Sequence, residues 1–128
     1  MKSVPKLRNG HTIMYSDYDQ TVVNELSVGF DFRSNLLVVD DQTDYDDDRR
    51  NNVTIAVVDR VDAQQLARRL GVPIDDLPRF IAESMSEWSK IVNASWRQVQ
   101  ECFDEITECF LDEGCQFRIE RLYGPKCG

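Results

Sequence analysis

The sequence has few of the residues on which recognisable catalytic chemistry depends. It contains one histidine, His11, in 128 residues, and no carboxylate or nucleophile stands at a spacing that would pair with it as a general base. It has no phosphate-binding glycine loop and no dinucleotide fingerprint. Its four cysteines include no Cys-x-x-Cys pair, so a structural zinc site is not indicated. These absences favour a non-catalytic protein and predict neither a cofactor nor a metal.

Long apolar runs and an excess of positive charge are also lacking. No apolar run approaches the roughly 20 residues that cross a bilayer, and residues 1–10 carry positive charge without the apolar segment of a secretion signal. We therefore expect a cytoplasmic, soluble protein with reduced cysteines. The formal net charge of −8 disfavours direct binding to nucleic acid or to an anionic membrane. It favours a basic partner, and the oligomeric state stays open.

Apolar periodicity predicts strands in the first half of the chain. Length and composition fit one domain over 11–123, with a flexible basic arm at 1–10 and a tail at 124–128. Alternation over residues 26–32, the apolar run at 36–40 and a similar run at 53–59 predict three strands, the first two forming a hairpin. Residues 11–15 are compatible with the beginning of the first strand. Residues 16–25 fit either a helix or a strand.

The second half of the chain has the period of helices. Asp62 is placed to cap a helix that ends at Gly71, and a second apolar stripe covers residues 77–92. Ser95 and Gln98 form the capping box of a third helix, with Cys102 and Cys109 on its apolar stripe. Residues 117–123 predict a final strand. The sequence thus predicts an α+β fold, a mainly antiparallel sheet of about four strands with three helices on one face, in the order βββααα-β.

Two acidic segments are the candidate binding sites, although solvated surfaces that only aid solubility are the simpler interpretation of both. The stretch from residue 40 to 52 is predicted to be a connection of about twelve residues between two strands, and the third helix carries acids at three- and four-residue steps. Carboxylates at such steps lie about 5–6 Å apart, comparable to phosphates along a nucleic-acid strand. The candidate partner-binding residues are Asp40, Asp41, Asp44, Asp46, Asp47, Asp48, Glu101, Asp104, Glu105, Glu108 and Asp112.

The favoured interpretation is a small acidic interaction protein, an inhibitor or nucleic-acid mimic of phage or mobile-element type. Its partner would be the basic surface of another protein, such as one that handles nucleic acid. Residues 63–80 resemble a helix-turn-helix, which implies a DNA-binding regulator as an alternative. A metal- or carboxylate-dependent enzyme is a second alternative, although a calcium loop starting at Asp44 has Arg49 in place of its glycine and Ile55 in place of its glutamate.

Overall fold

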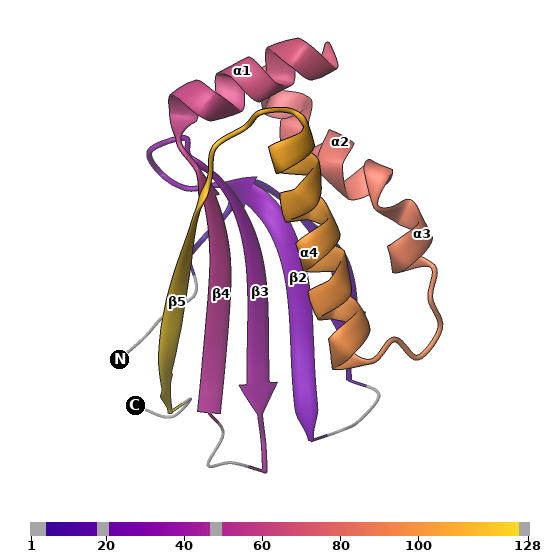
Figure 1. Cartoon of the computed structure of the whole chain (residues 1–128). Helices are drawn as coiled ribbons and strands as arrows, with labels where there is room; N and C mark the ends of the chain where they lie inside the picture. Colours follow the sequence, from indigo (N-terminus) through magenta and orange to yellow (C-terminus); the bar gives the residue numbers. More distant parts are fainter. Residues whose placement is uncertain (1–4, 18–20, 47–49, 126–128) are drawn as a thin grey trace.

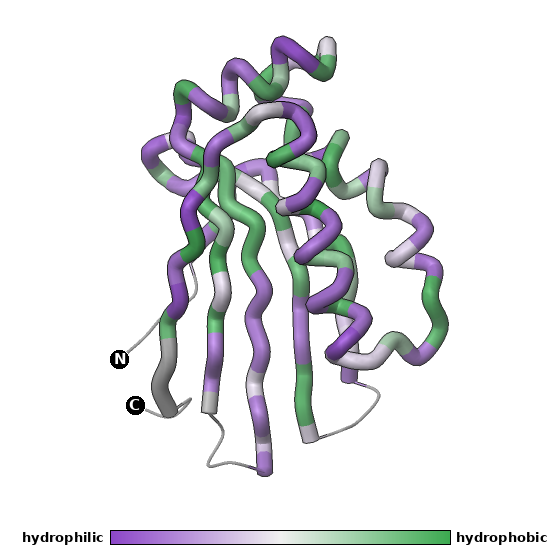
Figure 2. The backbone as a smooth tube through the Cα atoms, in the orientation of Figure 1, coloured by the Kyte–Doolittle hydropathy of each residue, from purple (hydrophilic) through white to green (hydrophobic). Residues whose placement is uncertain are grey.

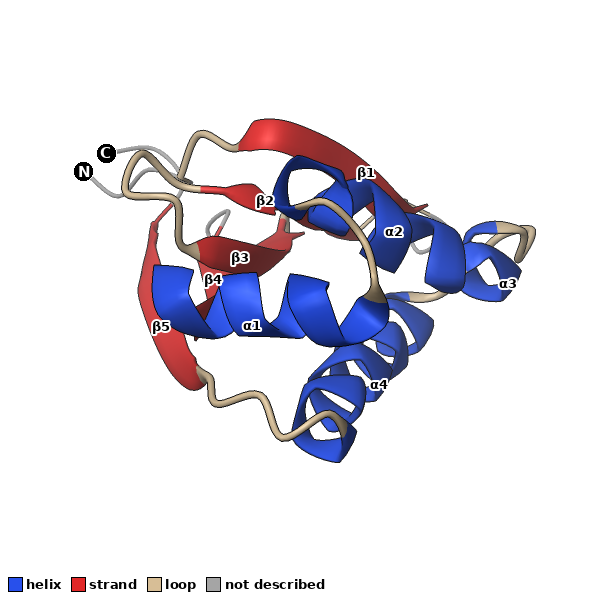
Figure 3. Ribbon diagram, turned by 90° about the horizontal axis from the view of Figure 1, so that it is seen from above, coloured by secondary structure: helices blue, strands red, loops and turns tan. Residues whose placement is uncertain are grey.

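The protein is an α+β structure in which a curved antiparallel sheet carries its helices on one face (Figures 1 and 3). The computed structural model describes the backbone of residues 5–17, 21–46 and 50–125, and their side chains except those of residues 50 and 123–125. The strands follow one another in the order β1-β2-β3-β4-β5. All the described helices are inserted between β4 and β5.

The described sheet has one strand more than the sequence predicts. Its strands are β1 (Arg8–Ser16), β2 (Val22–Phe30), β3 (Leu36–Asp44), β4 (Arg50–Val58) and β5 (Arg118–Pro125). The α+β class and the antiparallel pairing are confirmed, but four strands precede the helices instead of three. From Val22 onward the undecided segment is strand, in keeping with the preference of β-branched residues for sheets. Strand β1 begins at Arg8, inside the expected arm.

The helical half differs from the prediction in two boundaries. Its elements are α1 (Arg60–Leu70), the 3₁₀ turn η1 (Ile74–Asp76), α2 (Leu77–Ser84), α3 (Ser86–Ser89) and α4 (Trp96–Asp112). The expected single helix over 77–92 is wrong because Met85, with φ −101° and ψ 20°, departs from helical geometry. The expected cap at Asp62 is also wrong, since α1 begins at Arg60 and Asp59 occupies the N-cap position. None of the described helices is both long and apolar enough to span a membrane.

Helix α4 begins where the sequence predicts. The hydroxyl of Ser95 accepts a hydrogen bond from the Gln98 backbone N–H at 3.2 Å. The side-chain oxygen of Gln98 accepts one from the Ser95 backbone N–H at 2.9 Å, which completes the capping box. Gly114, with φ 69°, lies just beyond the helix in the left-handed conformation typical of helix ends. The position of α4 in the chain is therefore fixed by local sequence.

The core lies between the sheet and the helices. Helices α2, α3 and α4 pack on β1 to β3, and α1 crosses one end of the sheet (Figures 1 and 3). Because side chains alternate along a strand, Leu36 and Val38 enter this core, whereas Leu37 and Val39 join a smaller apolar cluster on the other face. The run of apolar residues in β3 is explained by these two faces. Figure 2 shows β3 turning hydrophilic at the end far from α1.

The acidic segment is mostly strand, and the expected connection of about twelve residues is wrong. Residues Asp40 to Asp44 belong to β3 and pair with Leu26 to Val22 of β2 and with Thr54 to Arg50 of β4. The connection between β3 and β4 is residues 45–49. Aspartate has a low intrinsic preference for strands, but hydrogen bonding to a neighbour on each side fixes the backbone of this central strand.

Candidate interaction surface

Helix α4 presents an acidic surface to solvent. Its apolar residues Val99, Phe103, Ile106 and Phe110 are buried against the core, so its polar residues point outward. All five acids that the sequence marks on this helix are exposed. We define the α4 acidic face by these residues, Glu101, Asp104, Glu105, Glu108 and Asp112.

The α4 acidic face has no cation of its own. Glu83 on α2 pairs with Arg79 at 3.7 Å, and Glu87 on α3 pairs with Lys90 at 3.7 Å. By contrast, within the described ranges no lysine or arginine nitrogen lies within 4.0 Å of a carboxylate of the α4 acidic face. The one basic residue of α4 is Arg97, whose guanidinium carbon lies 5.4 Å from the centre of the Trp96 ring. Among the residues that the structure describes, the five carboxylates of the α4 acidic face therefore have no ion-pair partner.

The β3 aspartates do not extend this surface as the sequence analysis expects. Asp40 is only 5% exposed, and the alternation of the strand places it on the face that α4 covers. Asp41 lies on the opposite face, where the amide nitrogen of Asn51 donates to its Oδ1 at 2.7 Å. The expectation that residues 40–48 form one outward-facing acidic segment is therefore wrong, because neighbouring residues of a strand point to opposite sides.

The remaining aspartates of the segment lie at or beyond the end of β3. Asp44 is half-buried and its Oδ1 accepts the backbone N–H of Asp46 at 3.0 Å. Asp46 is exposed. Asp47 and Asp48 lie outside the described residues. Of the two acidic segments predicted to bind a partner, only the one on α4 thus forms an exposed row of carboxylates on a described element.

Asp40 is an unusual carboxyl group beneath α4. Its pKa is raised to about 7 from an ordinary value of 3.8, and burial is the largest cause. A hydrogen bond from the side chain of Asn24 lowers the pKa, and the charges of Asp41 and Asp104 raise it. Asn24 is fully buried on β2. Among the described residues, neither Asp40 Oδ1 nor Asn24 Oδ1 has a hydrogen-bond partner. The sequence indicates this burial, because alternate residues of a strand point to the same face and Asp40 follows Leu36 and Val38 at steps of two residues.

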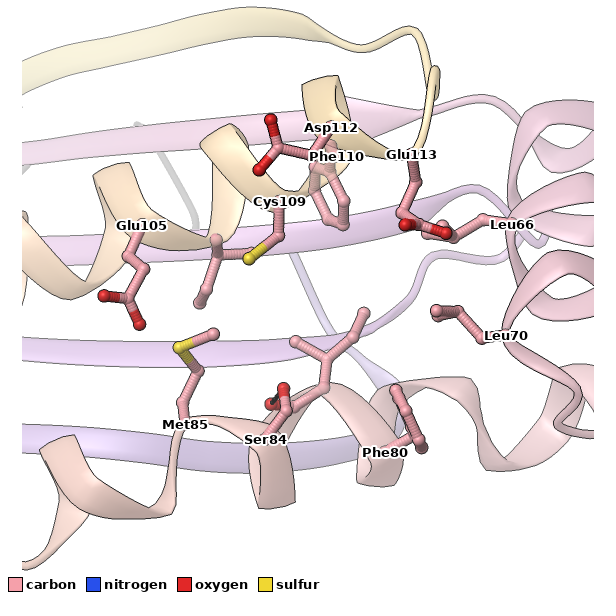
Figure 4. A pocket seen from close by; sticks show the side chains of 12 residues that line it. Leu66, Leu70, Phe80, Ser84, Met85, Glu105, Cys109, Phe110, Asp112 and Glu113 are labelled. Carbon is pink, nitrogen blue, oxygen red and sulfur yellow. Dashed lines mark hydrogen bonds between the residues drawn. The ribbon is translucent and has the colours of Figure 1, made fainter.

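A groove lies between α1, α2 and α4, on the flank of α4 that faces α2 (Figure 4). Its volume is about 420 Å³, and its lining is mainly apolar, including Leu66, Phe80, Met85 and Phe110. Three carboxylate residues of the α4 side also line it, and these are Glu105, Asp112 and Glu113. We call this cavity the helical groove. Two members of the α4 acidic face thus stand at the border of an apolar cavity.

Side-chain contacts join α4 to two neighbouring helices beside the helical groove. The indole nitrogen of Trp88 on α3 donates to Glu105 Oε2 on α4 at 3.0 Å. The Arg69 guanidinium on α1 donates to the backbone carbonyl of Glu113, just after α4. These two bonds join α4 to α3 and to α1, while the space toward α2 stays open. The groove is therefore formed before any ligand arrives.

The cysteines are arranged differently from the prediction that both Cys102 and Cys109 belong to the apolar stripe. Cys102 is buried but Cys109 is exposed and lines the helical groove. Burial raises the pKa of Cys102 to about 12 and that of Cys115 to about 11. Burial and the neighbouring carboxylates, Glu105 foremost, raise the pKa of Cys109 as well. All three are therefore neutral thiols at pH 7.

The other sequence hypotheses have these structural counterparts. Across the described residues, no three His, Cys, Asp or Glu side chains are grouped as a metal site would require. Residues 63–80 comprise most of α1, the turn η1 and the first half of α2. In this region the Arg79 guanidinium lies 3.3 Å from the carboxylate of Asp76 and 3.7 Å from that of Glu83.

Comparison of the chain with protein families, with curated proteins and with solved structures finds no match.

Proposed function

We propose that this protein is a non-catalytic interaction protein that binds the basic surface of a macromolecular partner through the α4 acidic face. The observation that carries the proposal is the set of five exposed carboxylates on one helix, without a paired cation in the described structure. A helix fixed to the sheet by buried side chains holds such charges in place, which lowers the entropy lost on binding.

The charges on the α4 acidic face are better explained by binding to a partner than by a contribution to the stability of the fold. Like charges three and four residues apart destabilise a helix by about 0.2–0.5 kcal/mol for each pair, so the α4 acidic face does not stabilise its own helix. Glu83 and Glu87 are offset by cations one turn away. A basic partner would supply the missing cations on α4, and the gain would fall with added salt, because salt screens exposed charges.

The partner is most sharply defined as a basic protein with a surface for nucleic acid. Acids three or four residues apart on α4 have Cβ atoms about 5–6 Å apart, so a groove that accepts a phosphate backbone meets a comparable row of negative charges. The protein would then act as an inhibitor or as a nucleic-acid mimic. Bound partner should accordingly be displaced by duplex DNA as well as by salt.

The test compares two variants of equal charge. In the first, the α4 acidic face is replaced by amides, which changes the formal net charge from −8 to −3. In the control, five described acids outside α4 are replaced in the same way, and these are Asp17, Asp62, Asp75, Glu83 and Glu87. Each immobilised protein captures basic proteins from a lysate of its source cells, followed by elution with salt and with duplex DNA.

The expected result is a basic protein that the wild type and the control retain and the first variant does not. It should elute with duplex DNA and with salt of about 0.3 M, where screening is strong. Equal loss in both variants would mean that total charge, and not the α4 acidic face, governs capture, and would reject the proposal. The same follows if no captured protein distinguishes the variants.

A further inference from the structure

The helical groove combines two properties that belong to different kinds of ligand. Its lining is mainly apolar, with Phe80 38% exposed at the α2 side. Its α4 side carries Glu105, Asp112 and Glu113, and Arg69, which is bonded there, contacts a backbone carbonyl. An apolar ligand group would be buried against the lining, and a cation beside it would meet the carboxylates. A ligand that fits both parts is apolar on one side and positively charged on the other.

We infer that the helical groove binds a cationic amphipathic helix of the partner, whose apolar side chains enter the cavity while its lysines or arginines face the α4 carboxylates. This inference rests on the function proposed above and names the chemistry of its partner. The position of α4 supports it, because Trp88 on α3 and Arg69 on α1 already bond to Glu105 and to the Glu113 carbonyl on the α4 side of the groove.

The length of the groove agrees with a helical occupant. Glu105 and Asp112 are seven residues apart on α4 and both line the cavity. At 1.5 Å per residue they are separated by about 10 Å along the helix axis. Apolar residues at positions i, i+4 and i+7 of a ligand helix span about the same length. Two turns of a partner helix can therefore place their apolar residues in the groove and their flanking cations along α4.

Charge selects this occupant over another copy of the same chain. Each copy has a formal net charge of −8, and each presents carboxylates at the border of the groove, so two copies meeting there would place like charges together. An uncharged apolar helix would fill the cavity but would leave the carboxylates partly desolvated without a cation. The cationic amphipathic helix satisfies both the lining and the border.

Three synthetic peptides of one length test the inference against the wild-type protein. The first has leucines at i, i+4 and i+7 and lysines elsewhere, the second has serines in place of the leucines, and the third has glutamines in place of the lysines. We expect the first peptide to bind at least tenfold more tightly than either of the others, and to lose affinity as salt rises. Fluorescence anisotropy of labelled peptides measures each affinity.

A pair of variants on α4 locates the binding site. Cys109→Phe fills the helical groove without changing the charge, whereas Leu111→Phe adds similar bulk at an exposed residue that does not line it. The first variant should weaken the leucine peptide at least tenfold and leave the serine peptide unchanged, and the second should change neither. Circular dichroism establishes that both variants fold, and the three-peptide comparison stands by itself if either does not.

The outcomes separate this inference from the proposed function. If the leucine and serine peptides bind equally and both weaken with salt, the groove inference is overturned and the acidic-face function stands. If the glutamine peptide binds as tightly as the lysine peptide, the cationic partner is overturned. Unchanged binding of the leucine peptide to Cys109→Phe would also contradict a site in the groove. If no cationic peptide binds even at low salt, the proposed function fails together with this inference.

Discussion

Replacing Asp40 by asparagine should stabilise the protein at pH 8 and have little effect at pH 4. Asp40 is 5% exposed beneath α4, and burial is the main reason that its pKa lies at about 7 instead of 3.8. The charges that raise it come from Asp41 on its own strand and from Asp104 on α4, and the side chain of Asn24 on β2 opposes them. An asparagine keeps the size of the side chain and carries no charge at any pH.

The sign and size of the effect follow from the two pKa values. Below pH 3.8 the carboxyl of Asp40 is protonated in both the folded and the unfolded chain, so its ionisation costs the protein no stability. As the pH rises toward 7, the unfolded chain releases the proton and the folded chain retains it, so the wild type loses stability. At about 1.36 kcal/mol per pH unit, the loss is about 1.7 kcal/mol at pH 5 and about 4 kcal/mol at pH 8.

Asparagine also changes the hydrogen bonding at this position. Asn24 Oδ1 and Asp40 Oδ1 both lack a partner among the described residues. The amide group of an asparagine at position 40 is a hydrogen-bond donor, which the ionised carboxylate is not. Because the protonated carboxyl of the wild type can donate as well, asparagine gains over it only where Asp40 is ionised. The pKa difference between the folded and the unfolded chain already includes this gain.

Urea unfolding from pH 5 to pH 8, followed by the fluorescence of Trp88 and Trp96, measures this effect. The difference between Asp40→Asn and the wild type should grow by about 2–3 kcal/mol over this range. Asp46→Asn, which neutralises an exposed aspartate of the same segment, should stay within about 0.5 kcal/mol of the wild type at both ends. A difference that does not grow with pH, or a variant that is less stable at pH 8, would refute the reasoning.

Three further predictions concern the fold and its thiols. Ser95→Ala removes the hydroxyl of the α4 capping box and should lower the free energy of unfolding by about 1 kcal/mol in urea titrations; an unchanged value would contradict the role of the box. Gly29→Ala would place a methyl group 3.0 Å from the backbone of β1 and should lower the free energy of unfolding by about 1–3 kcal/mol in the same assay. Its control, Ser27→Ala on the same face of β2, should lower it by under about 0.5 kcal/mol. In the native protein a thiol reagent should modify the exposed Cys109 first, at a lower rate than an unperturbed thiol because the pKa of Cys109 is raised. The reagent should reach the buried Cys102 only when the protein unfolds. Peptide mass spectrometry measures the order of modification, and the reverse order would contradict this arrangement.

Local patterns were sufficient to predict the class of the fold. The alternation of Leu26, Val28 and Phe30 predicts a strand, and the capping box of Ser95 with Gln98 predicts the first turn of α4, because both signals depend only on neighbours in the chain. The outward position of the α4 acids follows from the same helical period. These features of the fold and of the candidate surface required no knowledge of distant contacts.

The sequence by itself therefore determined the elements with a strong period of their own and the acidic character of α4. Only the tertiary structure decided the rest. Asp40 to Asp44 are strand because β2 and β4 both pair with them, and Asp40 is buried because α4 packs over that face. The helical groove, likewise, exists only where α1, α2 and α4 meet. Local preference specifies a helix or a strand, whereas burial and cavities depend on residues that are far apart in the chain.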